Sequence, residues 1–137
     1  MGLYESNFIR LAWLAGSLGS LAGSHRSSVA GDCDLVLTVT ERSPYTSTLT
    51  LSYLLPEPEG EGSYPDMRLR IYHDAHLVEA QQWAAVHMQP VLRALRTRAE
   101  RELDQRWGRN VMLNKWLEYC VERGHRFSNR TRLSAGA

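Results

Sequence analysis

The sequence of 137 residues lacks the features that most readily assign a chemistry to a protein. Its two cysteines, Cys33 and Cys120, lie far apart and form no CxxC pair, so neither a zinc site nor a disulfide framework is predicted. No apolar run approaches the roughly 20 residues of a membrane-spanning helix. No GxxxxGK[ST] loop is present, and the spacing assembles no Ser-His-Asp or Cys-His set. We therefore expect a cytoplasmic protein with reduced thiols, no cofactor and no membrane contact, and lean against an enzyme.

The net charge of +1 conceals an uneven distribution of charge along the chain. Residues 1–92 carry 5 of the 16 basic and 10 of the 15 acidic residues, so their net charge is −5, whereas residues 93–137 have a net charge of +6. The two parts could attract each other within one fold, or the second could offer a basic surface to a polyanion. Nucleic-acid-binding domains usually carry a much higher net charge, which favours the first interpretation.

The stretch 67–80 predicts the β-hairpin around which the rest of the chain is organised. If residues 74–75 form a two-residue turn, side-chain alternation places Arg70 opposite Glu79 on one face and apolar partners opposite one another on the other face. A shift of one residue would break both kinds of pair, so the register is well specified. Asp-Ala suits such a turn less well than Asp-Gly, and a longer loop that begins at His73 is the alternative.

The sequence before this hairpin predicts a helix and a second hairpin. Apolar residues spaced three and four apart predict a helix over residues 4–22, weakened by its glycines. Alternating leucines in residues 34–41 and 46–54 predict two strands that pair Leu37 with Leu49 across a five-residue loop. One face of this hairpin is aliphatic, and the Thr- and Ser-rich face is expected to meet water.

The remaining segments are predicted as loops and C-terminal helices. Residues 23–32 are a connection rich in Gly and Ser, and residues 56–66 are a loop rich in Pro, Gly and acids. Helix formers dominate residues 92–103, which could be a separate helix, the start of the next one, or a loop. A further helix is predicted over residues 104–123, where Gly124 provides a stop.

These elements predict an α+β fold. It has a four-stranded antiparallel β-meander, with the N-terminal helix and one or two C-terminal helices packed on one face. The composition, 43% hydrophobic and 23% charged, is typical of one globular domain, which we place at residues 1–124. Residues 125–137 are polar and basic without periodicity and are predicted to be a disordered tail.

The order of several short motifs resembles a known family. The motifs are Glu5-Ser6-Asn7-Phe8, Glu41 with Tyr45-Thr46, Arg70-Ile71-Tyr72-His73-Asp74-Ala75 with Glu79, and Asn110, Leu113, Trp116-Leu117, Cys120 and Gly124. Together they resemble the YqiB-like family of small bacterial proteins of unknown function. The resemblance implies a bacterial cytosolic protein and supplies no activity. The Arg-rich residues 92–103 depart from the family pattern.

The polar residues of the predicted central hairpin form the first candidate site. His73, Asp74 and His76 are residue types that bind metals, but Glu79 falls on the opposite face, and we predict no metal. A site for a small anionic molecule or nucleotide is the alternative to a purely structural Arg70–Glu79 pair. The candidate ligand-binding residues are Arg70, Tyr72, His73, Asp74 and Glu79.

An Arg-rich helix over residues 93–109 forms the second candidate site. Helical spacing would place Arg98, Arg101 and Arg109 near one side, where they could contact phosphates of a nucleic acid. Interleaved acidic residues would repel the same phosphates, which favours a solvated helix face instead.

Three classes of function remain. The first is a non-enzymatic regulatory or protein-interaction module, with an unidentified protein partner or a second copy of the chain, because exposed sheet edges favour homodimers. The second is a small-molecule or nucleotide-binding protein that uses Arg70, Tyr72 and Glu79. The third is nucleic-acid binding through the Arg-rich helix.

Overall fold

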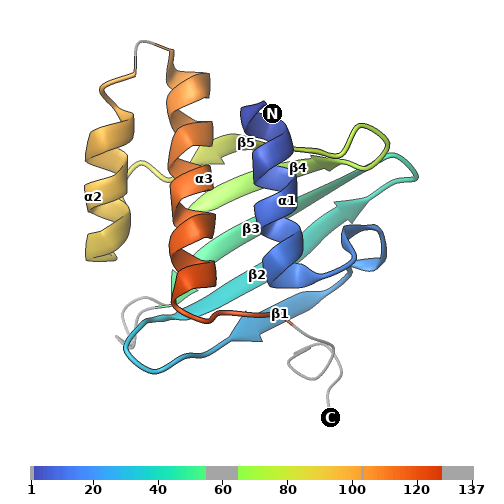
Figure 1. Ribbon diagram of the computed structural model, residues 1–137, viewed down its shortest axis with the longest axis horizontal. Helices are drawn as coiled ribbons and strands as arrows, with labels where there is room; N and C mark the ends of the chain where they lie inside the picture. Colours follow the sequence, from blue (N-terminus) through green and yellow to red (C-terminus); the bar gives the residue numbers. More distant parts are fainter. Residues whose placement is uncertain (1, 55–64, 103, 128–137) are drawn as a thin grey trace.

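Five antiparallel strands follow one another along the chain and form one sheet in the order β1-β2-β3-β4-β5 (Figure 1). The computed structural model describes residues 2–54, 65–102 and 104–127. The strands are β1 Ser24–Ser27, β2 Asp34–Arg42, β3 Thr46–Leu54, β4 Met67–Tyr72 and β5 Leu77–Trp83. The helices are α1 Leu3–Ala15, the short 3-10 helix η1 Leu18–Ser20, α2 Pro90–Ala99 and α3 Gln105–Glu122.

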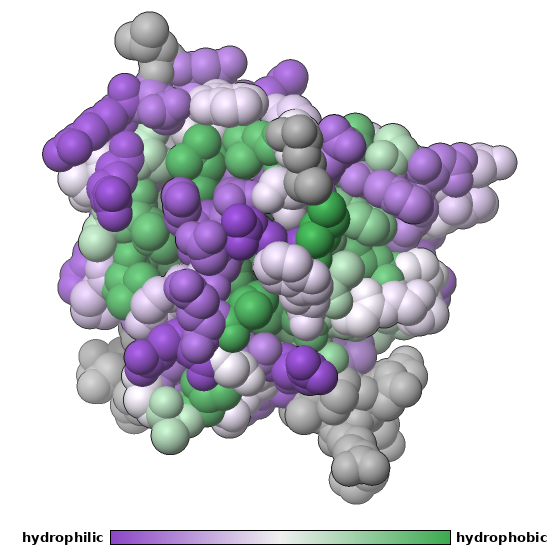
Figure 2. Space-filling model, in the orientation of Figure 1, coloured by the Kyte–Doolittle hydropathy of each residue, from purple (hydrophilic) through white to green (hydrophobic). Residues whose placement is uncertain are grey.

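Two helices cover one face of this sheet, and no described element covers the other, which is called here the open face. α1 and α3 lie side by side across the sheet, while α2 packs against α3 on its outer side (Figure 1). On the helix-covered side, hydrophilic side chains separate the hydrophobic ones into small patches (Figure 2). No helix in the described part of the chain is both long and apolar enough to cross a membrane.

Leucines at alternate strand positions build the core beneath the helices. Leu35, Leu37, Leu49, Leu51 and Leu69 are fully buried, and the residues between them point to the open face. The predicted helices cover this aliphatic face, because an apolar sheet face must be buried against another element.

The prediction of four strands was wrong, because β1 lies within residues 23–32, which were expected to be a loop. The inward residues of β1 are His25 and Ser27, so this strand has no apolar alternation to detect. Most of their polar atoms have partners inside the protein: Nε2 of His25 lies 2.7 Å from the carbonyl oxygen of Ala22, and Ser27 contacts His125. A polar strand can therefore be buried where partners are supplied.

The N-terminal helix is shorter than predicted. α1 ends at Ala15, and Gly16 follows with φ of 74°, a left-handed conformation that interrupts the helix. The 3-10 helix at Leu18–Ser20 then continues the chain to β1. The remainder of the predicted helix, residues 16–22, is thus an irregular connection.

The β2–β3 hairpin keeps its predicted faces but not its predicted register. Leu37 pairs with Leu51 and Val39 with Leu49, two residues away from the prediction. An irregularity between Val39 and Glu41 shortens the connection to residues 43–45. Because the side-chain period of a strand is two, this shift leaves the aliphatic residues on the helix side.

The central hairpin has the predicted register. Arg70 pairs with Glu79 and Ile71 with Val78. The turn is the longer alternative: it spans residues 73–76, and His76 has φ of 55°. A left-handed residue after a tight turn is a common way to close a hairpin loop of this length.

At the C-terminal end, residues 92–103 follow the alternative of a separate helix. The Arg-rich stretch 93–109 is therefore divided between α2 and α3, and α3 begins after the cap Asp104, as predicted. Residues expected to begin the tail are packed, because His125 and Phe127 are buried and the Phe127 amide donates to the Leu14 carbonyl oxygen at 2.7 Å. The predicted loop at 55–64 and the tail at 128–137 lie outside the described residues.

Buried amide side chains join the first helix, the last helix and the edge strand β5. Asn110 on α3 accepts from the Ala80 amide at 2.7 Å and donates to the Ala80 carbonyl oxygen at 3.5 Å, as a neighbouring strand would. Asn7 on α1 donates to the Val78 carbonyl oxygen and to Asn110, and it accepts from Asn114 at 3.0 Å. The edge of β5 is thereby occupied by side chains of α1 and α3.

Candidate functional site

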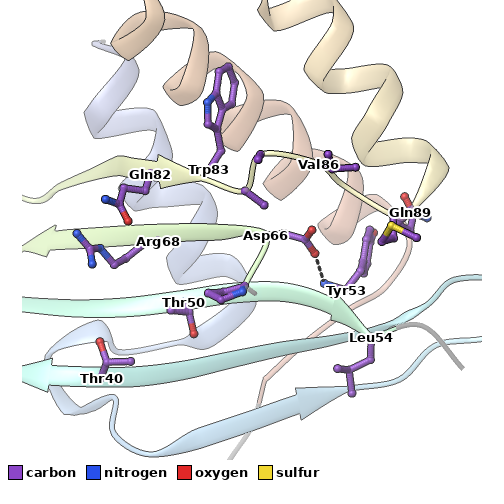
Figure 3. A pocket seen from close by; sticks show the side chains of 14 residues that line it. Thr40, Thr50, Tyr53, Leu54, Asp66, Arg68, Gln82, Trp83, Val86 and Gln89 are labelled. Carbon is purple, nitrogen blue, oxygen red and sulfur yellow. Dashed lines mark hydrogen bonds between the residues drawn. The ribbon is translucent and has the colours of Figure 1, made fainter. Parts of the chain in front are cut away.

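Polar side chains form a row across the open face of the sheet. Thr50, Arg68 and Gln82 are cross-strand partners on β3, β4 and β5, and Thr40, at the irregularity in the β2–β3 pairing, lines the same hollow (Figure 3). Directly opposed residues have Cβ atoms about 4.5–5.5 Å apart, so their polar groups can contact one ligand together. This row is the floor of the candidate site.

A hollow of about 820 Å³ lies above this row at the end of the sheet. Leu54 at the end of β3, with Val86 and Met88 from the connection between β5 and α2, form its apolar wall. These three side chains are 37%, 69% and 62% exposed, respectively. Ligand sites typically have volumes of about 300–1,000 Å³ and combine apolar walls with a few polar groups, as this hollow does.

The connection between β5 and α2, called here the 84–89 segment, is held at several points. Its residues alternate, so that Val86 and Met88 face outward while His87 and Gln89 are buried. The Gln89 side chain accepts from the Leu92 amide at 2.9 Å and caps α2. The apolar wall is therefore part of a fixed structure.

Arg96 of α2 holds the 84–89 segment from beneath. Its Nη1 donates to the Ala84 carbonyl oxygen at 2.8 Å and to His87 Nε2 at 3.1 Å, and its guanidinium lies 3.6 Å from the centre of the Trp83 ring. Because Arg96 can only donate, Nε2 of His87 accepts and its Nδ1–H donates to the Asp66 carboxylate at 3.1 Å. His87 thereby links Arg96 of α2 to Asp66, immediately before β4.

Among the residues that the structure describes, Asp66 is the one acidic residue that lines the hollow, and its oxygens are already engaged. One oxygen accepts from His87 and the other from the Tyr53 amide at 3.0 Å. Arg68 is the one cationic lining residue, and among the residues described here it makes no ion pair. An exposed, unpaired guanidinium is thus the principal charge offered to a ligand.

The predicted Arg70–Glu79 pair is adjacent in register but does not form an ion pair within the described structure. Tyr72 instead donates to Glu79 Oε1 at 3.0 Å, and Arg106 Nε lies 3.7 Å from Oε2. Burial, and then the hydrogen bond to Glu79, raise the pKa of Tyr72. The carboxylate is therefore engaged by partners that the sequence did not indicate.

The two histidines of the central turn point to different neighbours. Nε2 of His73 lies 2.9 Å from Ser47 Oγ, whereas His76 stacks on Phe8 of α1 with ring centroids 4.9 Å apart. Asp74 at the tip of the turn is exposed. Over the described ranges of the chain, no three His, Cys, Asp or Glu side chains form a metal-binding group.

The arginines predicted to bind nucleic acid are divided between separate elements. Arg98 is exposed on α2, and Arg101 is exposed in the turn that follows. Arg109 on α3 is half-buried, and its Nε donates to the Ala80 carbonyl oxygen at 3.4 Å. Arg109 thus contacts the edge of the sheet.

The structure brings together a Ser, a His and an Asp that sequence spacing did not suggest. His125 Nδ1 lies 2.9 Å from Ser27 Oγ, and His125 Nε2 lies 2.9 Å from Asp32 Oδ2. This connectivity resembles a catalytic triad. However, the His125 and Asp32 side chains are 0% and 3% exposed, and Ser27 Oγ accepts from the Arg126 amide. The cluster therefore ties residues 125–126 to β1 inside the protein.

The same aspartate organises a second buried group. Tyr53 donates its hydroxyl hydrogen to Asp32 Oδ2 at 2.7 Å, and the hydroxyl oxygen lies 3.6 Å from Cys120 Sγ. Burial raises the pKa of the Cys120 thiol from 9.0 to about 12, with Asp32 adding to the increase and the Tyr53 hydrogen bond opposing it. Burial also raises the pKa of Tyr53. Both groups are neutral at physiological pH.

Comparison with known proteins identifies the family of the chain. The model of a family described as protein of unknown function, DUF1249, matches residues 10–126. The chain belongs to this family. The match includes every strand and the last part of α1, from Arg10 onward, so the matched region contains the open sheet face and the 84–89 segment. No curated protein and no solved structure matches the chain significantly.

Sequence reasoning missed the hollow, although two signals for it exist. Arg68 alternates with the buried Met67 and Leu69, which assigns it to the same open face as Arg70. Apolar and polar residues alternate over 86–89 immediately before Pro90, which occupies the first position of α2. The position of Arg68 received no attention because the Arg70–Glu79 pairing suggested a site around Arg70. The alternation over 86–89 is equally compatible with a longer β5.

Proposed function

We propose that the protein is a non-enzymatic binding domain that holds a small molecule with a negatively charged group in the hollow on its open sheet face. The observation that carries the proposal is Arg68, which lies between Thr50 and Gln82 in a hollow of about 820 Å³ without an ion-pair partner among the described residues. Arginine binds anions through several hydrogen bonds at once.

The proposed site lies two residues along β4 from the predicted one. Arg68 and Arg70 share the open face, but only Arg68 lines the hollow. Glu79 is engaged by Tyr72 and Arg106, so the polar groups around Arg70 already contact one another. The class of function is therefore small-molecule binding, the second of the three predicted classes, with a different central arginine.

Arg68→Gln is expected to weaken binding of a fluorescent amphiphilic anion, anilinonaphthalene sulfonate, by at least about tenfold, because a hydrogen bond to a charged group contributes about 1.5–3 kcal/mol. Fluorescence titration of the folded protein measures the affinity. Arg98→Gln, which removes an exposed charge on α2, is the matched control and should bind like the wild type.

Circular dichroism must show the same fold in all three proteins, because partly unfolded proteins also bind this probe. Absence of saturable binding to the wild type would contradict the proposal, and so would equal affinities of the wild type and Arg68→Gln.

A protein-interaction module is the second candidate, and exposed apolar side chains on α1 favour it. Ile9 and Trp13 lie one turn apart and are 36% and 55% exposed, and the Arg10 guanidinium lies 5.8 Å from the centre of the Trp13 ring. Aromatic residues and arginine are enriched in interfaces. The candidate partner is a second copy of the chain, because this surface would be self-complementary about a two-fold axis.

If this candidate is correct, the wild type will form a concentration-dependent dimer and Trp13→Glu will remain monomeric, because a buried unpaired charge opposes association. Sedimentation velocity over a wide concentration range measures both, and Arg98→Gln again serves as the control. A wild type that is monomeric at every concentration would remove the homodimer.

The narrower likeness to YqiB-like proteins, and the bacterial cytoplasm that it implies, are part of the proposal. Nucleic-acid binding receives less support from the geometry, because Arg109 contacts Ala80 whereas Arg98 and Arg101 lie on α2 and the following turn. Binding of a small anion agrees with the net charge of +1, which is low for a nucleic-acid-binding domain.

A further inference from the structure

The polar groups of the hollow specify the charge of its ligand. Arg68 supplies one positive charge, and the buried carboxylate of Asp66 lines the same hollow. A ligand with one negative charge is neutralised by Arg68, whereas a second negative charge would find no further cation among the described lining residues and would share the hollow with the Asp66 carboxylate. The lining therefore favours a monoanion.

The neighbours of Arg68 specify the shape of the charged group. Thr50 and Gln82 flank Arg68 directly on the two adjacent strands, and each can donate one further hydrogen bond. A guanidinium binds a planar carboxylate through two parallel hydrogen bonds, and the neutral donors can reach the remaining lone pairs of its two oxygens. A single arginine with two neutral neighbours suits a carboxylate better than a doubly charged phosphate.

The wall specifies the rest of the ligand. Leu54, Val86 and Met88 expose apolar surface toward the hollow, and the hydrogen bonds of Arg96 and His87 hold the 84–89 segment in place. Apolar surface removed from water by a ligand contributes about 25 cal/mol per Å². Methionine adapts to different apolar shapes, which suits a ligand with an aliphatic or aromatic body.

We infer that the ligand of this hollow is a monocarboxylate with an apolar or aromatic body, whose carboxylate binds Arg68 between Thr50 and Gln82 and whose body lies against Leu54, Val86 and Met88. This inference rests on the proposed binding function and adds the class of the ligand.

Competition among matched compounds tests the ligand class. Naphthoate, naphthamide and naphthyl phosphate share one apolar body and differ in the charged group, and each is titrated against the bound anilinonaphthalene sulfonate. Naphthoate should displace the probe at least about tenfold more effectively than naphthamide, because the amide lacks the charge that pairs with Arg68. Naphthyl phosphate should also displace the probe less effectively than naphthoate.

Two variants separate the two halves of the site. Arg68→Gln should reduce the advantage of naphthoate over naphthamide, since both then meet a neutral group. Met88→Gln, at an exposed position, should weaken naphthoate and naphthamide by the same factor, since it changes only the wall.

The outcomes distinguish the inference from the function on which it rests. If the probe binds in an Arg68-dependent manner but naphthyl phosphate or naphthamide displaces it as well as naphthoate, the carboxylate class is overturned and the binding function stands. If the probe binds without dependence on Arg68, or does not bind, both are overturned. Preferential displacement by naphthoate that depends on Arg68 supports both.

Discussion

Replacement of Asn110 by leucine is expected to lower the free energy of unfolding by about 3 kcal/mol, because buried polar groups lose their partners. Asn110 is fully buried, and its side-chain oxygen accepts from the Ala80 amide and from the Asn7 side chain. Leucine has a similar size but cannot accept these bonds. Each donor left unpaired away from water costs about 1–3 kcal/mol.

Urea denaturation followed by circular dichroism measures this change. Lys115→Leu on the same helix is the matched control, because Lys115 is exposed and its change should stay within about 0.5 kcal/mol. The variant Asn7→Leu disrupts the same hydrogen-bonded cluster from the α1 side. The decrease in the free energy of unfolding of the double variant Asn7→Leu/Asn110→Leu should therefore be smaller than the sum of the two single decreases. A loss below about 1 kcal/mol for Asn110→Leu would show that water or a rearranged backbone satisfies the edge of β5.

Alkaline pH is expected to destabilise the protein strongly, through the buried thiol of Cys120. Its pKa is 9.0 in the absence of perturbation and about 12 in the folded protein, so the unfolded chain releases the proton first. The stabilising contribution is complete below pH 9 and is lost as pH rises toward 12. By pH 10.5 the loss from this group alone is about 2 kcal/mol.

Urea denaturation at a series of pH values from 8 to about 10.5 tests this expectation. Cys120→Ala should be less stable at pH 8 but show a shallower decline with pH, and Tyr53→Phe should also reduce the slope because burial raises the pKa of Tyr53. Cys33→Ser is the control: Cys33 is only half-buried, so its removal should change the slope less. Equal slopes for the wild type and Cys120→Ala would contradict a protonated thiol at this position.

The parts of the fold predicted correctly were those in which apolar and charged residues alternate unambiguously. The pairing of Arg70 with Glu79 and of Ile71 with Val78 followed from alternation, because any one-residue slip exchanges faces. The register between Leu37 and Leu51 did not follow, since a shift of two residues leaves every side chain on the same face. Alternation thus determines which face each side chain occupies, but it does not distinguish between strand registers that differ by an even number of residues.

The missed strand and the missed site share a physical cause. β1 buries His25 and Ser27, whose partners include His125, a residue far away in the sequence. The hollow likewise depends on His87, which is buried against Asp66, immediately before strand β4. Local patterns indicate which residues avoid water, but they do not indicate which distant partner satisfies a buried polar group.

The placement of α1 beside α3 has a consequence for synthesis of the chain. The strands can pair one after another as they leave the ribosome, because each is adjacent in sequence to its neighbour in the sheet. The aliphatic face, however, is covered only by α1 until α3 has been translated. Until then, Asn7 also lacks its hydrogen-bond partners Asn110 and Asn114. A nascent chain that stalls before α3 therefore exposes an apolar sheet, the kind of surface that chaperones bind and that aggregates when they are absent.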